Sequence, residues 1–332
     1  MTAPLEVTES AATAPPEAAL AGVSRKAIQG RSLGQIAWMR LKRDKVAMAG
    51  GVVVVFLVVV AVFAPLIIKW WGYPYDEFHY DLVDDSTGLP LHGWGGMSWD
   101  HWFGVEPING RDLFSRVVYG AQFSLLIAFL ATLVSVVIGV VMGVIAGYFG
   151  GWVDTAISRL MDIFLAFPLL LFAIALVGVM PNDAFGLSGN SLRVGVIVFI
   201  IGFFGWPYIG RIIRGQVLSL REREFIDAAR SLGARRPYIL FRELLPNLMA
   251  PILVYSTLLI PTNILFEAAL SFLGVGIQRP VPSWGDMLQD AAKWYQTDTQ
   301  YMLPSGLAIF ITVFAFNLFG DGLRDALDPR AR

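Results

Sequence analysis

Six long stretches without a charged residue constrain the fold of this 332-residue chain more than any other feature. A helix that spans a bilayer needs about 20 predominantly apolar residues. Two such helices with a turn would need more than about 40, so even the longest stretch predicts one helix, over about 118–148. The sequence therefore predicts an all-α membrane protein with six transmembrane helices, in residues 46–68, 117–153, 163–182, 194–210, 244–266 and 299–320.

Composition supports the same class. Hydrophobic residues make up 56% of the chain and charged residues 15%, whereas a soluble domain usually carries about 25% charged residues. There is no cysteine, which excludes disulfides, thiolate nucleophiles and cysteine-ligated metals. No lysine follows a glycine, and neither H-E-x-x-H nor G-x-S-x-G occurs, so P-loop and common hydrolase motifs are missing. We predict neither enzymatic activity nor a nucleic-acid partner, and a surface in contact with membrane lipid.

Basic residues are distributed unequally between the two sides that six spans create. With the N-terminus inside, 19 of the 25 Lys and Arg residues fall in the expected cytoplasmic segments, which are 1–45, 149–162, 211–243 and 321–332. The other 6 are Lys69, Arg111, Arg116, Arg193, Arg279 and Lys293. This bias follows the positive-inside rule and predicts that both termini are cytoplasmic.

The spans divide the chain into segments with different expected roles. Residues 1–31, rich in Ala, Thr and Pro, predict a disordered cytoplasmic tail. Residues 32–45 predict a basic amphipathic segment along the inner leaflet, although an ordinary basic flank of the first span explains the pattern nearly as well. The remaining expected domains are a first transmembrane helix 46–68, an extracytoplasmic loop 69–116, a five-helix core 117–320 with a cytoplasmic loop 211–246, and a cytoplasmic tail 321–332.

The extracytoplasmic loop contains all three histidines, His79, His92 and His101, near several aspartates. A divalent-metal site is one interpretation, but no ligand spacing indicates it, so we favour solvated loop polarity. The loop is also rich in aromatic residues, and those nearest the helix ends are typical of an interfacial belt. Its length leaves a docking or lid role open.

Two features of the predicted spans need an explanation. Glu267 is the one plausible intramembrane acid, but no His, Asp or Arg lies at comparable depth to relay protons. We favour a structural role for it, or a position near the outer surface where it would need no partner. On the second helix, small residues recur every four positions, at Ser135, Gly139, Gly143 and Gly147. For these we favour packing within the chain over a seam between subunits.

A short amphipathic helix is predicted between the fourth and fifth spans. Phe225, Ala228, Ala229 and Leu232 fall at i, i+3, i+4 and i+7, so they share one helix face. A protein with so little mass outside the membrane has no core of its own in which to bury this face. The pattern therefore predicts docking onto a separate protein.

This segment resembles the EAA motif of ATP-binding-cassette (ABC) importer permeases, in which an acidic-Ala-Ala triplet precedes a glycine and then a Leu-Pro pair. The corresponding residues are Asp227-Ala228-Ala229, Gly233 and Leu245-Pro246, with Asp in place of the usual Glu. Further stretches are similar to the dipeptide, oligopeptide and nickel branch, namely Gly110-Arg111-Asp112-Leu113-Phe114-Ser115-Arg116, Gly147-Tyr148-Phe149-Gly150-Gly151, Glu267-Ala268-Ala269-Leu270-Ser271-Phe272-Leu273-Gly274 and Pro282-Ser283-Trp284-Gly285.

The resemblance implies a type I importer permease fold in a multi-pass subunit of the cell membrane, which moves peptides or a related small solute inward by alternating access. Implied partners are a second homologous permease, two cytosolic ATPase subunits that bind the ATP, and an extracytoplasmic substrate-binding protein. No cofactor is implied on this chain. Residues 222–234 would form a coupling helix seated on one ATPase, ended by Gly233 in a left-handed turn. The implied site residues are Glu224, Phe225, Asp227, Ala228, Ala229, Leu232, Gly233, Leu245 and Pro246.

Two other classes of protein remain as alternatives. A self-contained secondary transporter or channel would need paired intramembrane charges, inverted repeats or a carbonyl-rich filter, and the sequence shows none convincingly. A membrane-embedded hydrolase or transferase would need a nucleophile–base pair within the spans, which is also missing. Copurification with ATPase subunits, without ATP hydrolysis by the chain alone, would distinguish the permease from both.

Overall fold

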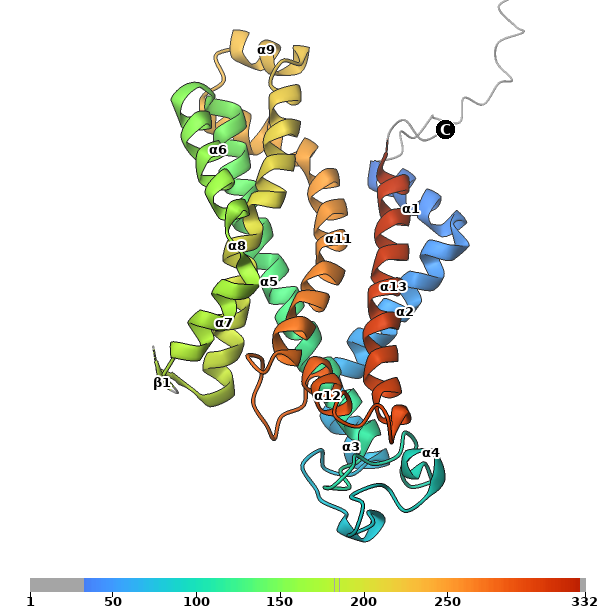
Figure 1. Ribbon diagram of the computed structural model, residues 1–332. Coiled ribbons are helices and arrows are strands. Elements are labelled where there is room, and N and C mark those ends of the chain that lie inside the picture. Colours follow the sequence, from blue (N-terminus) through green and yellow to red (C-terminus); the bar gives the residue numbers. More distant parts are fainter. Residues whose placement is uncertain (1–32, 182, 185, 329–332) are drawn as a thin grey trace, which may run out of the picture.

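The computed structural model describes residues 33–181, 183–184 and 186–328 (Figure 1). The predicted tail 1–31 lies outside these ranges. Five helices of the described chain are long and apolar enough to cross a membrane: α2 (Lys45–Val62), α5 (Leu113–Phe149), α8 (Gly189–Leu220), α11 (Leu245–Phe272) and α13 (Met302–Leu327). A sixth crossing results when the bent pair α6 (Gly151–Ala166) and α7 (Leu169–Val179) counts as one span. The predicted all-α membrane fold is confirmed.

The third span differs from the prediction of a turn over 149–162 and one helix in 163–182. Gly150 has a φ of 66° and reverses the chain at once, so α6 already begins at the next residue. The helix then breaks at Phe167, because Pro168 lacks an N–H donor and disfavours the α conformation of the residue before it. α6 and α7 are consequently bent by 75°.

Charged residues in α6 suggested a loop, but they face partners on α8. Asp154 pairs with Arg214, and Asp162 pairs with Arg211. Helix α6 can therefore carry these charges without leaving the helix bundle.

The small residues of α5 face α8. Ser135 Oγ donates a hydrogen bond to the carbonyl oxygen of Gly202, 2.9 Å away. A Cβ atom added at Gly143 would lie 2.6 Å from the carbonyl oxygen of Gly210, so only glycine allows this approach. The preference for packing within the chain over a subunit seam is confirmed.

At the end of the molecule opposite to α9 (Glu224–Ser231), the chain forms an irregular loop over residues 72–112 (Figure 1). Helix α3 (Ala64–Trp71) leads into this loop, which contains two short helical segments, η2 (Tyr80–Leu82) and α4 (Gly93–Gly96). Three further elements lie toward the same end: the antiparallel hairpin of β1 (Asp183–Ala184) and β2 (Leu187–Ser188), then α12 (Trp284–Ala291) and η4 (Thr299–Tyr301).

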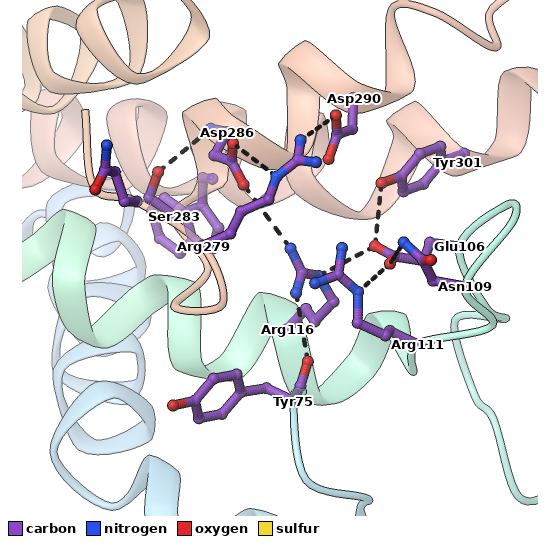
Figure 2. A network of polar contacts seen from close by, with 12 residues as sticks. Tyr75, Glu106, Asn109, Arg111, Arg116, Arg279, Ser283, Asp286, Asp290 and Tyr301 are labelled. Atoms are coloured by element: carbon purple, nitrogen blue, oxygen red, sulfur yellow. Dashed lines mark hydrogen bonds and ion pairs between the residues drawn. The ribbon is translucent and has the colours of Figure 1, made fainter. Parts of the chain in front are cut away.

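Two charged residues of the 72–112 loop that the sequence analysis did not connect, Glu106 and Arg111, take part in a buried network (Figure 2). Glu106 pairs with Arg111 and, at 3.4 Å, with Nε of Arg116 in α5. Arg116 is fully buried, and its Nη2 atom lies 3.9 Å from Asp286 Oδ2 in α12. Burial raises the pKa of the Asp286 carboxyl, and the nearby Arg279 opposes this rise. The network joins the loop to α5 and α12.

The buried histidine of the loop supports the start of α5. His101 Nδ1 lies 2.9 Å from Asp112 Oδ1, and Asp112 also accepts a hydrogen bond from the Ser115 N–H at 2.7 Å. No three His, Cys, Asp or Glu side chains in the described ranges are grouped so that they could hold a metal ion. The structure thus gives His101 a structural contact in place of solvent.

Glu267 is fully buried near the end of α11 and has a partner, so the interpretation that it needs none is wrong. Its Oε1 atom accepts a hydrogen bond from Ser271 Oγ at 2.7 Å. A Cβ atom added at Gly285 of α12 would lie 2.7 Å from the Cβ of the same serine. Glu267 thus fixes the Ser271 side chain at the point where α12 packs closely on α11. This position favours a structural role for Glu267.

Helix α1 (Leu33–Arg43) covers most of the predicted interfacial segment, but its apolar face meets protein. Leu41 is buried in a cluster with Ala47 of α2 and Ala326 of α13. The face that was expected to meet lipid is therefore occupied. Helix α13 also continues to Leu327, beyond the expected end at 320, which gives α1 a longer surface to pack on.

Candidate functional site

The segment between α8 and α11 consists of α9, α10 (Arg236–Tyr238) and the π-helix η3 (Ile239–Leu244), which runs directly into α11. Helix α9 lies at the extreme end of the molecule (Figure 1). Arg221, at the end of α8, donates a hydrogen bond from Nη1 to the carbonyl oxygen of Gly147 in α5, 3.0 Å away. The segment is thus connected to α5, α8 and α11.

Ile226 attaches α9 to these helices. It is fully buried, in one cluster with Val217 of α8 and with Ile239 and Leu244 of η3. Sequence reasoning missed this residue because it considered one face of α9. The available signal was an isoleucine about 100° around the helix from Phe225, outside the predicted face.

The predicted apolar face points away from the protein and borders a groove. Phe225 is 37% exposed and Leu232 is 88% exposed. With Ala228, Ala229 and Gly233 they line a groove of about 590 Å³, whose other walls are Ala234, Arg235, Tyr238 and Glu243. The structure therefore brings these five predicted residues to one open surface.

Gly233 ends α9 as the sequence predicts. Its φ is 77°, and its N–H donates to the carbonyl oxygen of Arg230 at 2.9 Å. The N–H of Ala234 donates to the carbonyl oxygen of Ala229 at 3.0 Å, which completes a Schellman motif. This turn directs the chain from α9 to the far wall of the groove.

The charged residues of α9 are exposed at the rim of this surface. Glu224 lies in the first helical turn, where a carboxylate is stabilised by the helix dipole. Asp227 Oδ1 accepts a hydrogen bond from Arg230 Nη1 at 3.1 Å, and both side chains remain largely exposed. Because this pair is exposed, little energy is needed to exchange it for a partner on another protein.

Leu245 and Pro246 lie apart from the groove. They begin α11, where Leu245 packs against the cluster around Ile226 and Pro246 is exposed. Because η3 runs into α11 without a break, Pro246 lies in a continuous helix, and its missing N–H donor directly follows the π-helical turn. These two residues therefore position α11 and do not line the groove.

The surface combines an apolar groove with charges at its rim. That arrangement suits a protein partner, because apolar burial supplies affinity and rim charges supply orientation. Among the residues that line the groove, no nucleophile is placed beside a base, as covalent chemistry would require. The geometry supports docking.

Known proteins identify the family. The family described as binding-protein-dependent transport system inner membrane component matches residues 139–332, more than half of the chain. The chain belongs to this family. A second family, the N-terminal TM domain of oligopeptide transport permease C, matches residues 32–88 of the same permease.

Curated relatives match the permease along most of its length. The dipeptide transport system permease protein DppC of Alkalihalophilus pseudofirmus is 41% identical over 296 residues, which cover 89% of this chain and 90% of that protein. The glutathione transport system permease protein GsiD of Shigella flexneri is 43% identical over 295 residues, with the same coverage.

A solved structure shares the permease fold. The inward-facing MetNI methionine ABC transporter matches with a TM-score of 0.51 and 20% identity, over 65% of this chain and 98% of that chain. This chain is accordingly a multi-pass, inner-membrane permease subunit of a binding-protein-dependent ABC importer, and its family binds no cofactor itself. Such a system includes ATPase subunits, in which ATP hydrolysis resides, a binding protein and a partner permease.

Proposed function

We propose that α9 is the helix through which this permease docks onto a cytosolic ABC ATPase subunit. The observation that carries the proposal is the open apolar groove on a helix that is fixed to the membrane part by Ile226. Phe225, Ala228, Ala229 and Leu232 supply the apolar contact, and Asp227 with nearby arginines sets the register. The orientation that follows puts α9, α1 and the end of α13 on the cytoplasmic side, in agreement with the distribution of basic residues.

The same contacts suggest how the motion of an ATPase reaches the membrane. A push on α9 acts on Ile226, and through its cluster on α8 and α11. The hydrogen bond from Arg221 to Gly147 extends the connection to α5. We propose that the spans tilt as a unit when the ATPase subunits close, and that the solute path then opens to the other side of the membrane.

We propose peptides as the substrate class, with dipeptides and glutathione as the first candidates. Support comes from the names of two relatives, which are a dipeptide and a glutathione permease. The proposed assembly contains this chain, a second homologous permease, two ATPase subunits and an extracytoplasmic binding protein that delivers the peptide.

The docking proposal is tested by filling the groove. In Ala229→Trp and Gly233→Asp variants we expect uptake of labelled dipeptide or glutathione to be lost while membrane insertion is retained. Disruption of an interface hot spot by about 2 kcal/mol would weaken ATPase association about thirtyfold. Ser231→Trp is the matched control, since Ser231 is exposed on α9 but does not line the groove. Normal ATPase copurification and uptake in the two groove variants would refute the proposal.

A further inference from the structure

Helix α1 ends where the chain enters the membrane. Figure 1 shows it beside the end of α13, at the same end of the molecule as α9. Asp44 forms the corner between α1 and α2, because its Oδ1 atom accepts hydrogen bonds from the N–H groups of Val46 at 2.9 Å and Ala47 at 3.0 Å. Val46 is 58% exposed at the start of an apolar spanning helix, so hydrocarbon begins within about one turn of this corner.

One basic residue near this corner is already engaged. Arg40 Nη1 donates a hydrogen bond to the carbonyl oxygen of Asp328, 2.7 Å away, and so fastens α1 to the end of α13. The carboxylate of Asp44 caps α2 and is also engaged.

Three other cations remain available. Lys42, Arg43 and Lys45 are exposed, and no carboxylate of the described residues lies within ion-pair distance of them, the aspartates of α13 included. They lie within four consecutive positions at the membrane surface. Their charge is therefore presented to whatever anion the bilayer provides.

The indole ring of Trp38 lies beside these cations. Trp38 is 52% exposed, and the ammonium nitrogen of Lys42 lies 5.2 Å from the centroid of its ring. Tryptophan is favoured at the level of lipid headgroups, where an apolar ring and a polar N–H can both be accommodated. The buried apolar face of α1 is held by α13, so it is this polar and aromatic face that is left for the membrane.

We propose that Trp38, Lys42, Arg43 and Lys45 bind the headgroup of an anionic phospholipid in the cytoplasmic leaflet. The guanidinium of Arg43 can donate paired hydrogen bonds to phosphate oxygens, and the two ammonium groups add positive potential. Juxtamembrane clusters of basic residues attract anionic lipid in this way. The inference rests on the proposed orientation, and it assigns the cations a role in the folded transporter besides their effect on the direction of insertion.

Lipid selectivity of the intact transporter tests this site. The complex is reconstituted into phosphatidylcholine nanodiscs with spin-labelled phosphatidylglycerol or spin-labelled phosphatidylcholine, and the immobilised fraction is measured. The native complex should prefer phosphatidylglycerol, and added salt should weaken this preference. In the triple variant Lys42→Gln, Arg43→Gln, Lys45→Gln we expect the preference to fall about fivefold or more.

A charge-matched control separates a site from general attraction. Arg159→Gln, Arg236→Gln, Arg242→Gln removes three exposed cations that do not line the groove beside α9, and it should leave the lipid preference unchanged. Equal loss in both triple variants would overturn the proposal, as would an unchanged preference in the first. Displacement of the lipid by inorganic phosphate at equal concentration would show an unspecific anion site and would overturn it too.

A single substitution keeps the test decisive if the triple variant assembles poorly. Trp38→Ala should lower phosphatidylglycerol preference, since it removes the ring beneath Lys42, and no change would contradict the site. The lipid preference is independent of ATPase docking. If lipid preference is absent while the groove variants still uncouple the ATPase, only the lipid proposal is wrong. If lipid preference is present while the groove variants transport normally, only the docking proposal is wrong.

Discussion

The two ends of this permease differ in their most distinctive feature, which is a buried network of charges at one end and an exposed helix beside a groove at the other. At the end with the 72–112 loop, Arg116 is fully buried and finds Glu106 and Asp286 within the same chain (Figure 2). At the α9 end, Leu232 is 88% exposed beside an open groove. The first end contains buried charges that are paired within the chain, and the second contains an open apolar groove beside an exposed helix.

The two features differ in whether this chain alone can satisfy them. Buried charges are tolerated only when they are paired, so the network around Arg116 has to be satisfied by this chain. Exposed apolar side chains cost less free energy than buried unpaired charges, and their burial under a partner subunit is favourable. We infer that the network around Arg116 is a fixed framework within this chain and that the groove beside α9 is covered by another subunit.

The largest expected effect is on the framework. Arg116→Leu removes one of two cations from each of the buried carboxylates Glu106 and Asp286, and breaking a buried pair costs about 3–5 kcal/mol. We expect a pronounced fall in the thermal unfolding temperature of the purified permease complex. Arg211→Leu is the control, because the Arg211–Asp162 pair is about half exposed and contributes little. Similar unfolding temperatures for the two variants would break the contrast between the ends.

A second prediction concerns the attachment of α9. Ile226→Ala removes a fully buried side chain from the cluster with Val217 and Ile239, at a cost of about 2–4 kcal/mol. Amide hydrogens of α9 should exchange faster, and uptake should fall. Leu232→Ala is the control for exchange, since that side chain is exposed. If exchange in α9 does not change in Ile226→Ala, the helix is held by something other than this residue.

The smallest expected effect is at the end of α9. A Cβ atom at Gly233 would meet nothing within 4 Å, so Gly233→Ala costs only the left-handed backbone, about 1–2 kcal/mol. Gly34→Ala is the control. A Cβ atom at Gly34 also meets nothing within 4 Å, but Gly34 has no positive φ, so uptake should not change. Partial loss of uptake is expected in the first variant alone. Equal uptake in both would show that the turn does not constrain the groove.

Features that depend on neighbouring residues could be predicted from the sequence. The charge-free stretches located five of the six spans, because a spanning helix needs about 20 predominantly apolar residues. The apolar face of α9 followed from helical periodicity, and the four-residue spacing on α5 indicated close helix packing within the chain.

Features that depend on distant residues could not be predicted. Asp286 lies far from Glu106 and Arg116 in the sequence, and no local pattern shows that they meet. The buried position of Ile226 depends on η3, which follows α9 only after the turn at Gly233. Pro168 separates α6 from α7, whereas Pro207, Pro251 and Pro261 lie inside helices, so the sequence did not show which proline breaks a span.

Site-specific crosslinking measures the central claim most directly, because the native chain has no cysteine. A single cysteine is introduced at Leu232, and a short bifunctional reagent is added to membranes that hold the assembled transporter. Val179→Cys is the control, since Val179 is 81% exposed but belongs to α7, away from α9. We expect the Leu232→Cys variant alone to crosslink to an ATPase subunit. Crosslinking to no subunit, or labelling of this cysteine by a membrane-impermeant reagent from outside the cell, would contradict the account.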